Sequence, residues 1–219
     1  MIKNKCVSLV YKTILITISF MAIYTMILNV NPSTFAYFTN LSNVLVFIIM
    51  LIVWIKTLKD VCYNKKYNEA NSHLVRIKGV ATLCIMVTGL VYAFLLADYS
   101  TKNNYTVQNL SVHYIIPLMT ILDYFLFDEK GLIKWYHPLI WVVTALMYLP
   151  FIFIRALILA PNTTQVKYPY FFIDVDKLGA GGVAIWCVIL VVVFSIIAYL
   201  IYLYDRLMAK RLTSNSKGL

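Results

Sequence analysis

The sequence contains a run of 27 residues, from Leu178 to Tyr204, without a single charged side chain. About 20 mostly apolar residues suffice for a helix to cross a bilayer, so this run predicts a transmembrane helix that tilts or continues past the membrane. Five similar stretches precede it: Ser8 to Leu28, Leu41 to Leu58, Gly79 to Ala97, Leu110 to Phe127 and Pro138 to Leu159. We therefore expect an all-α integral membrane protein with six transmembrane helices, forming a single domain over residues 1–219.

The composition excludes an ordinary soluble domain. Hydrophobic residues make up 62% of the chain and charged residues only 13%, whereas soluble domains carry about 25% charged residues. The apolar stretches are continuous and do not alternate with polar residues, which favours membrane helices over the strands of a β-barrel. The bilayer is therefore the first partner that we expect.

The basic residues predict the orientation of the helices. The net charge is +10, and 15 of the 19 Lys and Arg residues fall in the terminal segments and in the loops on their side of the membrane. Lys and Arg collect on the cytoplasmic side of membrane proteins, so we expect both termini in the cytoplasm. Because topology explains the charge, we expect no nucleic acid partner.

The sequence has no pattern typical of a metal or cofactor site. Its four cysteines, Cys6, Cys62, Cys84 and Cys187, form no CxxC pair. We expect no disulfide, no metal and no cofactor. The oligomeric state has no signal in the sequence.

Three polar residues open the second apolar stretch. Thr39, Ser42 and Asn43 are spaced i, i+3 and i+4, so they share one face of a helix. The first turn of that helix also offers unpaired backbone N–H groups and the positive end of the helix dipole, a suitable seat for an oxyanion. Thr39 has a simpler interpretation as the N-cap of the helix. The sequence leaves open whether Thr39 caps the helix or reacts.

His113 is the candidate base. The second and fourth stretches both enter the membrane from the outer side, so Thr39 and His113 each lie within about one turn of the same boundary. A neutral imidazole within hydrogen-bond reach is a common device for activating a Thr hydroxyl. The alternative is that His113 hydrogen-bonds another helix as part of the packing.

The charged residues predicted inside the spans are Asp123 and Arg155. Asp123 lies about 15 Å deeper than His113, given a rise of about 1.5 Å per residue, so it cannot orient that imidazole. Asp123 is either a functional group or part of a buried pair that fixes helix register. Arg155, near the outer end of the fifth span, either lines a solute path or is a snorkelling anchor.

Four motifs occur in order along the chain. They are F-x-x-F-T-x-x-S-N from Phe35 to Asn43, H-x-x-x-P-L-x-x-x-x-D from His113 to Asp123, Y-L-P-x-x-x-x-R from Tyr148 to Arg155 and Y-P-Y-F-F from Tyr168 to Phe172. Together they resemble the androgen-induced gene family of integral membrane proteins, and more closely its bacterial six-span branch. The resemblance covers essentially the whole chain.

The resemblance implies an activity and two catalytic residues. Eukaryotic members of that family are threonine hydrolases that cleave fatty acid esters of hydroxy fatty acids with an intramembrane Thr and His. Residue by residue, these two correspond to Thr39 and His113. The resemblance also implies a multi-pass protein of a bacterial plasma membrane. It assigns no role to Asp123 or Arg155.

The leading hypothesis from the sequence is a hydrolase of lipid acyl esters. His113 takes the proton of Thr39, and Thr39 attacks the ester carbonyl to form an acyl-enzyme. The oxyanion is held by Asn43, by Ser42 or by the N-terminal amides of the second span.

The lipid chains of such a substrate require a cavity between the spans. We expect its walls to include Phe38, Tyr114 and Tyr124. One alternative is a transporter or solute-binding protein that uses His113, Asp123 and Arg155, and another is a membrane scaffold without a site of its own.

Overall fold

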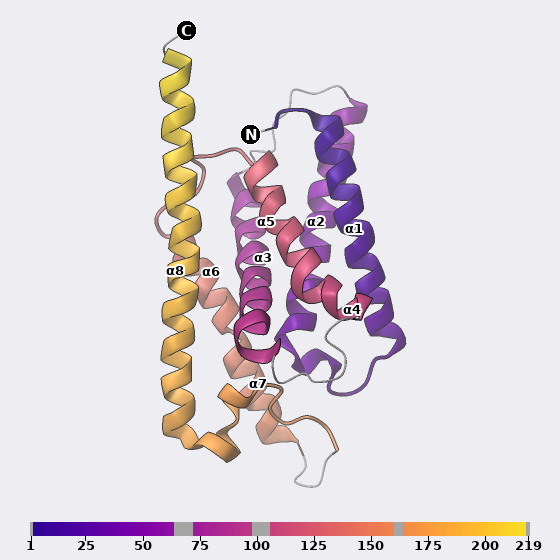
Figure 1. The fold of residues 1–219 in the computed structure, drawn as a ribbon, viewed down its shortest axis with the longest axis vertical. Coiled ribbons are helices and arrows are strands. Elements are labelled where there is room, and N and C mark those ends of the chain that lie inside the picture. Colours follow the sequence, from indigo (N-terminus) through magenta and orange to yellow (C-terminus); the bar gives the residue numbers. More distant parts are fainter. Residues whose placement is uncertain (1, 64–71, 98–105, 160–163, 218–219) are drawn as a thin grey trace.

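The computed structural model describes residues 2–63, 72–97, 106–159 and 164–217, and the regular structure in these ranges is entirely helical. Six segments are helical, long and apolar enough to cross a membrane. The prediction of an all-α protein with six transmembrane helices is therefore confirmed. Successive spans alternate in direction, and both termini lie at the same end of the bundle (Figure 1).

The described ranges contain α-helices joined or extended by short helical turns. The α-helices are α1 (Lys5–Leu28), α2 (Phe38–Cys62), α3 (Ser72–Val91), α4 (Val107–Leu110), α5 (Ile116–Phe127), α6 (His137–Leu146), α7 (Tyr148–Ile158) and α8 (Val175–Lys217). The 3-10 turns are η1 (Thr34–Ala36) and η5 (Phe171–Ile173), and the π-helical turns are η2 (Tyr92–Leu96) and η4 (Ser111–Ile115). Three spans are composite: α3 with η2, α4 with η4 and α5, and α6 with α7.

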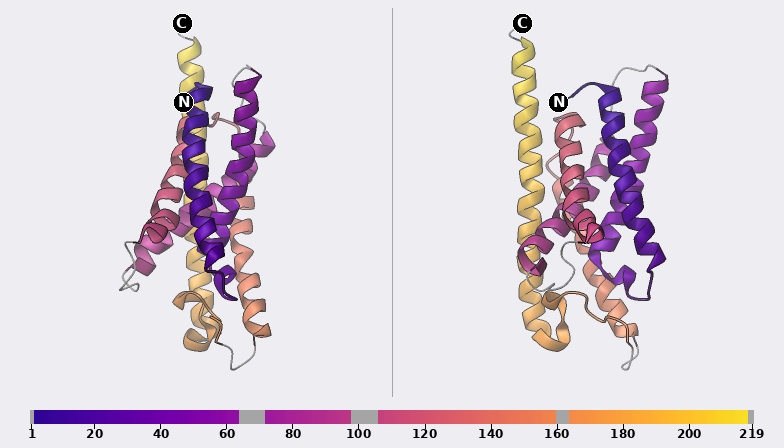
Figure 2. Two further views of the ribbon diagram at one scale, coloured as in Figure 1. Left: turned by 90° about the vertical axis from the view of Figure 1, so that its right-hand side faces the viewer. Right: turned by 45° about the vertical axis from the view of Figure 1, so that its right-hand side comes forward.

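We call the end that holds both termini the terminal end and the opposite end the far end. Helix α8 has 43 residues, about twice the length that crosses the hydrocarbon core. It extends beyond the rest of the bundle at the terminal end (Figure 2), as expected from its sequence. Near its start α8 bends at Gly179, whose φ of 67° suits a residue without a side chain.

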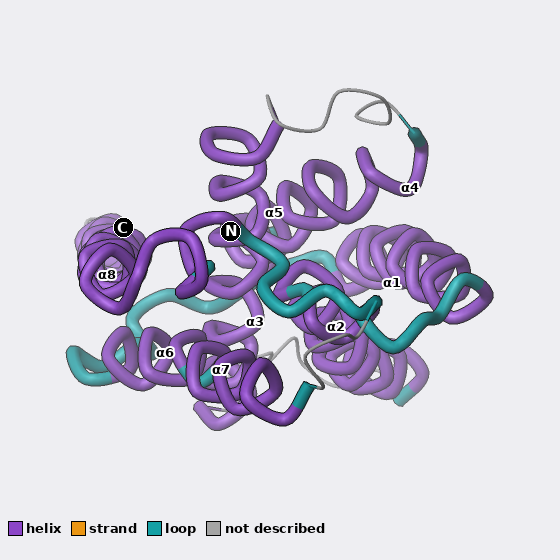
Figure 3. The backbone as a smooth tube through the Cα atoms, turned by 90° about the horizontal axis from the view of Figure 1, so that it is seen from below, coloured by secondary structure: helices purple, strands orange, loops and turns teal. Residues whose placement is uncertain are grey.

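Helix α3 lies in the middle of the bundle. It contacts α2 and α5 on one side and α6 and α8 on the other, and the view along the bundle places it between these helices (Figure 3). Helix α1 packs on α2 and α5, outside this centre. Side chains that α3 presents can therefore take part in sites on either side of the bundle.

Two prolines account for irregular turns in the spans. Pro150 has no N–H for the carbonyl of Leu146, four residues earlier, and the span breaks at Met147 into α6 and α7. The fifth span is thus two helices, where we expected one. Pro117 likewise leaves the carbonyl of His113 without its helical donor, and the turn before it widens into the π-helical η4.

A buried charge network joins the helices at the terminal end. Lys12 of α1 pairs with Asp123 of α5, with 3.1 Å from Nζ to Oδ1, and Lys78 of α3 pairs with both Asp123 and Asp128. These four side chains are at most 4% exposed. Opposite charges at such distances compensate one another where water does not reach.

A second part of the network ties α8 to the same end. The carboxylate of Asp205 accepts the hydroxyl of Tyr124 at 3.1 Å and the backbone N–H groups of Gly131 and Ile133 at 2.9 and 3.3 Å. The ammonium of Lys130 lies 4.0 Å from the centre of the Tyr124 ring. Four helices, α1, α3, α5 and α8, thus share one charged core at the terminal end.

Candidate functional site

Thr39 lies in the first turn of α2, at the far end. The residue at the N-cap position is Tyr37, and its side chain makes no capping hydrogen bond. Thr39 follows two residues later, inside the helix, so its interpretation as the N-cap is wrong. The backbone N–H groups of this first turn need an acceptor from elsewhere in the chain.

The hydroxyl of Tyr170 supplies that acceptor. Tyr170 belongs to the loop before η5, 131 residues from Thr39 in sequence, and its oxygen accepts the backbone N–H of Thr39 at 3.4 Å. The backbone N–H of Phe38 and the side chain of Thr39 also lie close enough to this phenol to lower its pKa. Tyr170 is only 8% exposed. Burial raises the pKa of the phenol above its ordinary value, although the donated bonds oppose the rise, so the hydroxyl is neutral at pH 7.

An apolar cavity opens beside the hydroxyls of Thr39 and Tyr170. A cavity of about 50 Å³ lies between α2, α3, α6, α7, α8 and the segment around η5. The walls are mostly aliphatic and aromatic, and the hydroxyl groups on them belong to Thr39, Thr88, Tyr148 and Tyr170. This volume is below the range of about 300–1,000 Å³ that is usual for ligand pockets, so a long chain must push the walls apart or extend out of the cavity. The walls themselves suit an aliphatic chain.

Ser42 and Asn43 hold the first turn of α2 against its neighbours. The hydroxyl of Ser42 donates to the carbonyl of Thr39 at 3.0 Å and lies 2.7 Å from the hydroxyl of Thr88 in α3. The amide nitrogen of Asn43 donates to the carbonyl of Thr39 at 2.8 Å and to that of Val112 in η4 at 3.2 Å. An amide nitrogen carries two hydrogens, so Asn43 has none left for an oxyanion.

His113 lies on η4, and its ring stacks on Tyr92 of η2, the turn that continues α3. Its ring is 3.7 Å from that of Tyr92 in η2, with an angle of 14° between the planes. The stack thus joins the two π-helical turns, a type of turn that is frequent at functional sites. The Nδ1 atom of His113 is buried and has no hydrogen-bond partner in the part of the chain that the structure describes. Gly89 of α3 permits the close approach, because a Cβ there would lie 3.1 Å from the carbonyl oxygen of His113.

Thr39 and His113 lie on neighbouring elements, but they do not touch. Asn43 links them indirectly, because its amide bonds the carbonyl of Thr39 and the carbonyl of Val112, the residue before His113. Between these two described side chains there is no hydrogen bond, and the backbone N–H of Thr39 donates to Tyr170. Direct proton transfer from Thr39 to His113 therefore requires the two side chains to move closer together or a bridging water.

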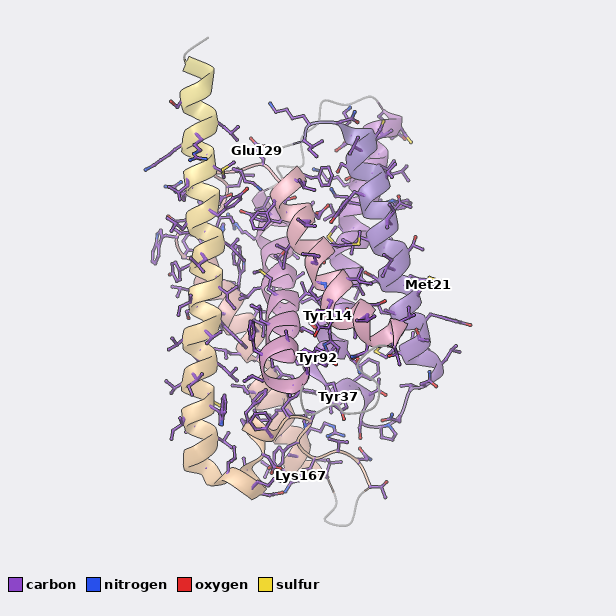
Figure 4. All side chains as sticks on the ribbon, in the orientation of Figure 1. Met21, Tyr37, Tyr92, Tyr114, Glu129 and Lys167 are labelled. Atoms are coloured by element: carbon purple, nitrogen blue, oxygen red, sulfur yellow. The ribbon has the colours of Figure 1, made fainter. Side chains whose placement is uncertain are left out.

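The aromatic residues expected to line the cavity have three different positions. Phe38 lies on the cavity wall. Tyr114 is 41% exposed on the outside of η4, where its ring packs edge-on against Tyr92 (Figure 4). Tyr124 is buried at the terminal end, in the charge network with Asp205. Neither Tyr114 nor Tyr124 lines the cavity beside Thr39.

Asp123 and Arg155 lie apart from this cavity and from each other. Asp123 is fully buried in its ion pairs at the terminal end. Arg155 of α7 donates to the carbonyl of Val166 at 2.6 Å, to the side chain of Gln165 at 3.2 Å and to the carbonyl of Pro32 at 3.4 Å. Its guanidinium thus fastens the segment before η5 to the loop between α1 and α2. Because neither residue lines the cavity beside Thr39, a shared solute path through them gains no support.

The structure brings together residues that the sequence reasoning did not connect. Tyr170 lies within the Y-P-Y-F-F motif, yet no role for it followed from the sequence. Lys12 and Lys78 were counted with the loop lysines, whereas both lie inside helices and are buried. A signal for Lys12 existed, because a buried carboxylate such as Asp123 needs a cation at its own depth in the membrane.

Comparisons with known proteins do not add to this geometry. No family model, curated protein or solved structure matches the chain. Conclusions about function therefore depend on the arrangement of Thr39, Tyr170, His113 and the cavity.

Proposed function

We propose that the protein is an intramembrane hydrolase of lipid acyl esters, with Thr39 as nucleophile and His113 as general base. The observation that supports this most is the position of Thr39 at the positive end of α2, on the wall of an apolar cavity between five helices. A hydroxyl placed there adjoins both a space suited to an acyl chain and backbone N–H groups that favour developing negative charge.

The reaction has two halves. In the first, Thr39 Oγ bonds to the ester carbonyl carbon while His113 takes the hydroxyl proton, and the carbonyl π electrons move to the oxygen as an oxyanion. The intermediate collapses, the alkoxide of the substrate leaves with the proton from His113, and the acyl group remains on Thr39. In the second half, water attacks the acyl-enzyme in the same way and releases the carboxylic acid.

The site favours a substrate with a long aliphatic chain. Thr88, Tyr148 and the two site hydroxyls are the polar side chains on walls otherwise formed by groups such as Val87, Leu190 and Phe194. Burying a chain there gains about 0.8 kcal/mol for each CH₂ removed from water. Esters of short acids gain little of this, so we expect activity to rise with acyl length.

The orientation and the membrane also belong to the proposal. With 15 of 19 Lys and Arg residues toward the terminal end, including Lys12 and Lys78 inside the helices, the terminal end faces the cytoplasm. The Thr39 cavity then lies toward the outer leaflet. The membrane that we propose is a bacterial plasma membrane, as the resemblance to the bacterial six-span branch implies.

Hydrolysis by the purified protein in lipid nanodiscs tests the proposal. With a long-chain acyl ester that releases a fluorescent alcohol, Thr39→Ala and His113→Ala should each lower kcat/KM at least about 10³-fold. The matched control is Thr120→Ala in α5, a buried threonine whose hydroxyl bonds only its own helix, to Ile116 at 2.8 Å. The proposal fails if folded Thr39→Ala keeps the activity of the unaltered protein.

A further inference from the structure

Most hydroxyl protons around the cavity are committed to other acceptors. Tyr148 donates to the carbonyl of Ala36 at 2.7 Å, and Thr88 donates to the carbonyl of Cys84 at 3.0 Å. Among the described residues, no backbone carbonyl accepts the hydroxyl of Thr39 or of Tyr170, and the oxygen of Tyr170 accepts the backbone N–H of Thr39 at 3.4 Å. Since the proton of Thr39 must leave during the reaction, the proton of Tyr170 is the one that can face a substrate.

The hydroxyl of Tyr170 is also polarised by helix α2. Its oxygen accepts the backbone N–H of Thr39 in the first turn of α2, where the positive end of the helix dipole lies. A hydroxyl that accepts such bonds becomes a stronger donor, because hydrogen bonds in a chain polarise one another. The polarised O–H group of Tyr170 thus extends the favourable electrostatic effect of the α2 N-terminus into the cavity.

We infer that Tyr170 is a catalytic residue whose hydroxyl donates the hydrogen bond to the oxyanion formed when Thr39 attacks an acyl ester. This inference depends on the proposed hydrolase function. No proton is transferred to the oxyanion: the Tyr170 O–H bond stays intact while the negative oxygen accepts it. When the intermediate collapses, the carbonyl re-forms and the hydrogen bond weakens.

The sequence named Asn43 and Ser42 as candidates for holding the oxyanion, but their donor protons already form hydrogen bonds within the protein. Both hydrogens of the Asn43 amide bond backbone carbonyls, of Thr39 and Val112. The hydroxyl of Ser42 bonds the carbonyl of Thr39 and contacts Thr88. These two side chains shape the first turn of α2, whereas Tyr170 reaches the cavity itself.

The segment that carries Tyr170 is held in place by contacts on both sides. The ring of Tyr170 stacks on Phe172 at 5.3 Å, with 3° between the planes, and meets Tyr37 edge-on at 6.2 Å. Before it in the chain, the backbone N–H of Val166 donates to the hydroxyl of Ser33 at 2.9 Å, next to the bonds from Arg155. A donor with a fixed ring needs no reorganisation when charge develops, which is the condition for effective oxyanion stabilisation.

The test is the variant Tyr170→Phe, which keeps the ring and removes the hydroxyl. Loss of one oxyanion donor typically lowers kcat about 10² to 10³-fold, and we expect KM to change less than about threefold. The matched control is Tyr11→Phe, which removes a phenol that donates to Met119 at 2.8 Å in the terminal half of the bundle. Tyr11→Phe should keep the kcat of the unaltered protein.

An inhibitor pair distinguishes catalysis from a structural role of Tyr170. A long-chain trifluoromethyl ketone forms an oxyanion with a nucleophilic hydroxyl, whereas the matching long-chain ether binds without reacting. Tyr170→Phe should weaken the ketone at least about tenfold and leave the affinity for the ether unchanged. Equal weakening of both, or a kcat within twofold of the unaltered protein, overturns the role of Tyr170. If Thr39→Ala remains active, the hydrolase proposal itself fails, whatever Tyr170→Phe does.

Discussion

Both ends of the bundle bury polar side chains, but these side chains are charged at the terminal end and uncharged at the far end. At the terminal end, Lys12, Lys78, Asp123 and Asp128 neutralise one another in a network that is at most 4% exposed. At the far end, the polar groups are uncharged, and an apolar cavity opens beside them. Among the described residues, buried polar atoms without a hydrogen-bond partner occur at both ends: Nδ1 of His113 and Oδ1 of Asn43 at the far end, and Nε of Arg76 and Nε2 of His137 at the terminal end.

This difference indicates which polar groups stabilise the fold and which are available for chemistry. A buried ion pair is strongly destabilising to break, because the remaining charge is left without compensation. Uncharged polar groups beside a cavity can change partners without leaving a buried charge uncompensated. We therefore assign the stability of the helix packing to the terminal end, and we propose the far end as the site.

The largest expected effect on stability comes from Asp123→Asn. It removes the carboxylate that pairs with the buried ammonium groups of Lys12 and Lys78. We expect the free energy of unfolding to fall by about 3–5 kcal/mol, measured by thermal denaturation in nanodiscs. The activity per folded molecule should stay unchanged, because Asp123 lies far from Thr39.

A double variant sharpens this prediction. Lys12→Met combined with Asp123→Asn also removes one of the two ammonium groups that Asp123 neutralises, so it should recover part of the stability that Asp123→Asn loses. If Asp123→Asn retains its stability but loses activity on the ester, the division between the two ends is wrong and Asp123 belongs to the functional site.

Gly89→Ala should have a smaller effect, and it acts on the far end. The new Cβ would lie 3.1 Å from the carbonyl oxygen of His113 and 3.3 Å from Cβ of Pro117, so η4 must shift by a few tenths of an ångström. We expect kcat/KM to fall about tenfold, since small displacements of a catalytic base are costly, with a loss of about 1 kcal/mol in stability. Gly181→Ala is the control, because a Cβ there meets no atom within 4 Å. Equal kinetics of the two variants would show that the position of His113 is not critical.

The smallest effect concerns pH and the loop at the terminal end. Burial lowers the pKa of Lys130 to about 8, although Asp128 and Asp205 oppose the shift. Between that value and the unfolded pKa of about 10.4, the unfolded chain binds a proton that the folded protein does not. The free energy of unfolding should therefore rise with pH in this window, by about 1 kcal/mol between pH 8 and 9.5.

The variant Lys130→Met isolates this contribution. The rise in melting temperature with pH should be smaller in Lys130→Met than in the unaltered protein, while hydrolysis at each pH stays the same. A pH dependence of stability identical in both proteins would show that Lys130 does not titrate in this window.

The fold could be predicted from the sequence because each span must form its backbone hydrogen bonds within itself in the membrane. A length of about 20 apolar residues is then a sufficient signal, and the six spans lie where the apolar stretches placed them. The break at Met147 was missed although Pro150 marks it, because a proline in a membrane helix leads to a kink or to a separate helix depending on its neighbours. The burial of Lys12 was missed because a count of Lys and Arg residues on each side of the membrane assumes that a lysine near a helix end is solvated.

The site was predictable only in part, since its geometry depends on contacts between distant segments. The sequence singled out Thr39 and His113, and the structure places them on neighbouring elements linked through Asn43. Tyr170 contacts Thr39, although 131 residues separate them in the sequence, and no local sequence pattern predicts that contact. The π-helical turns that hold Tyr92 and His113 likewise arise from packing of α3 against η4, helped by Pro117.

The central claim, that Thr39 is a nucleophile, is tested most directly by covalent labelling with a long-chain alkyl fluorophosphonate followed by peptide mapping. We predict one adduct per chain on Thr39, absent in Thr39→Ala, slowed in Tyr170→Phe and retained in folded Asp123→Asn. An adduct on another residue, or labelling of Thr39→Ala equal to that of the unaltered protein, would contradict the assignment.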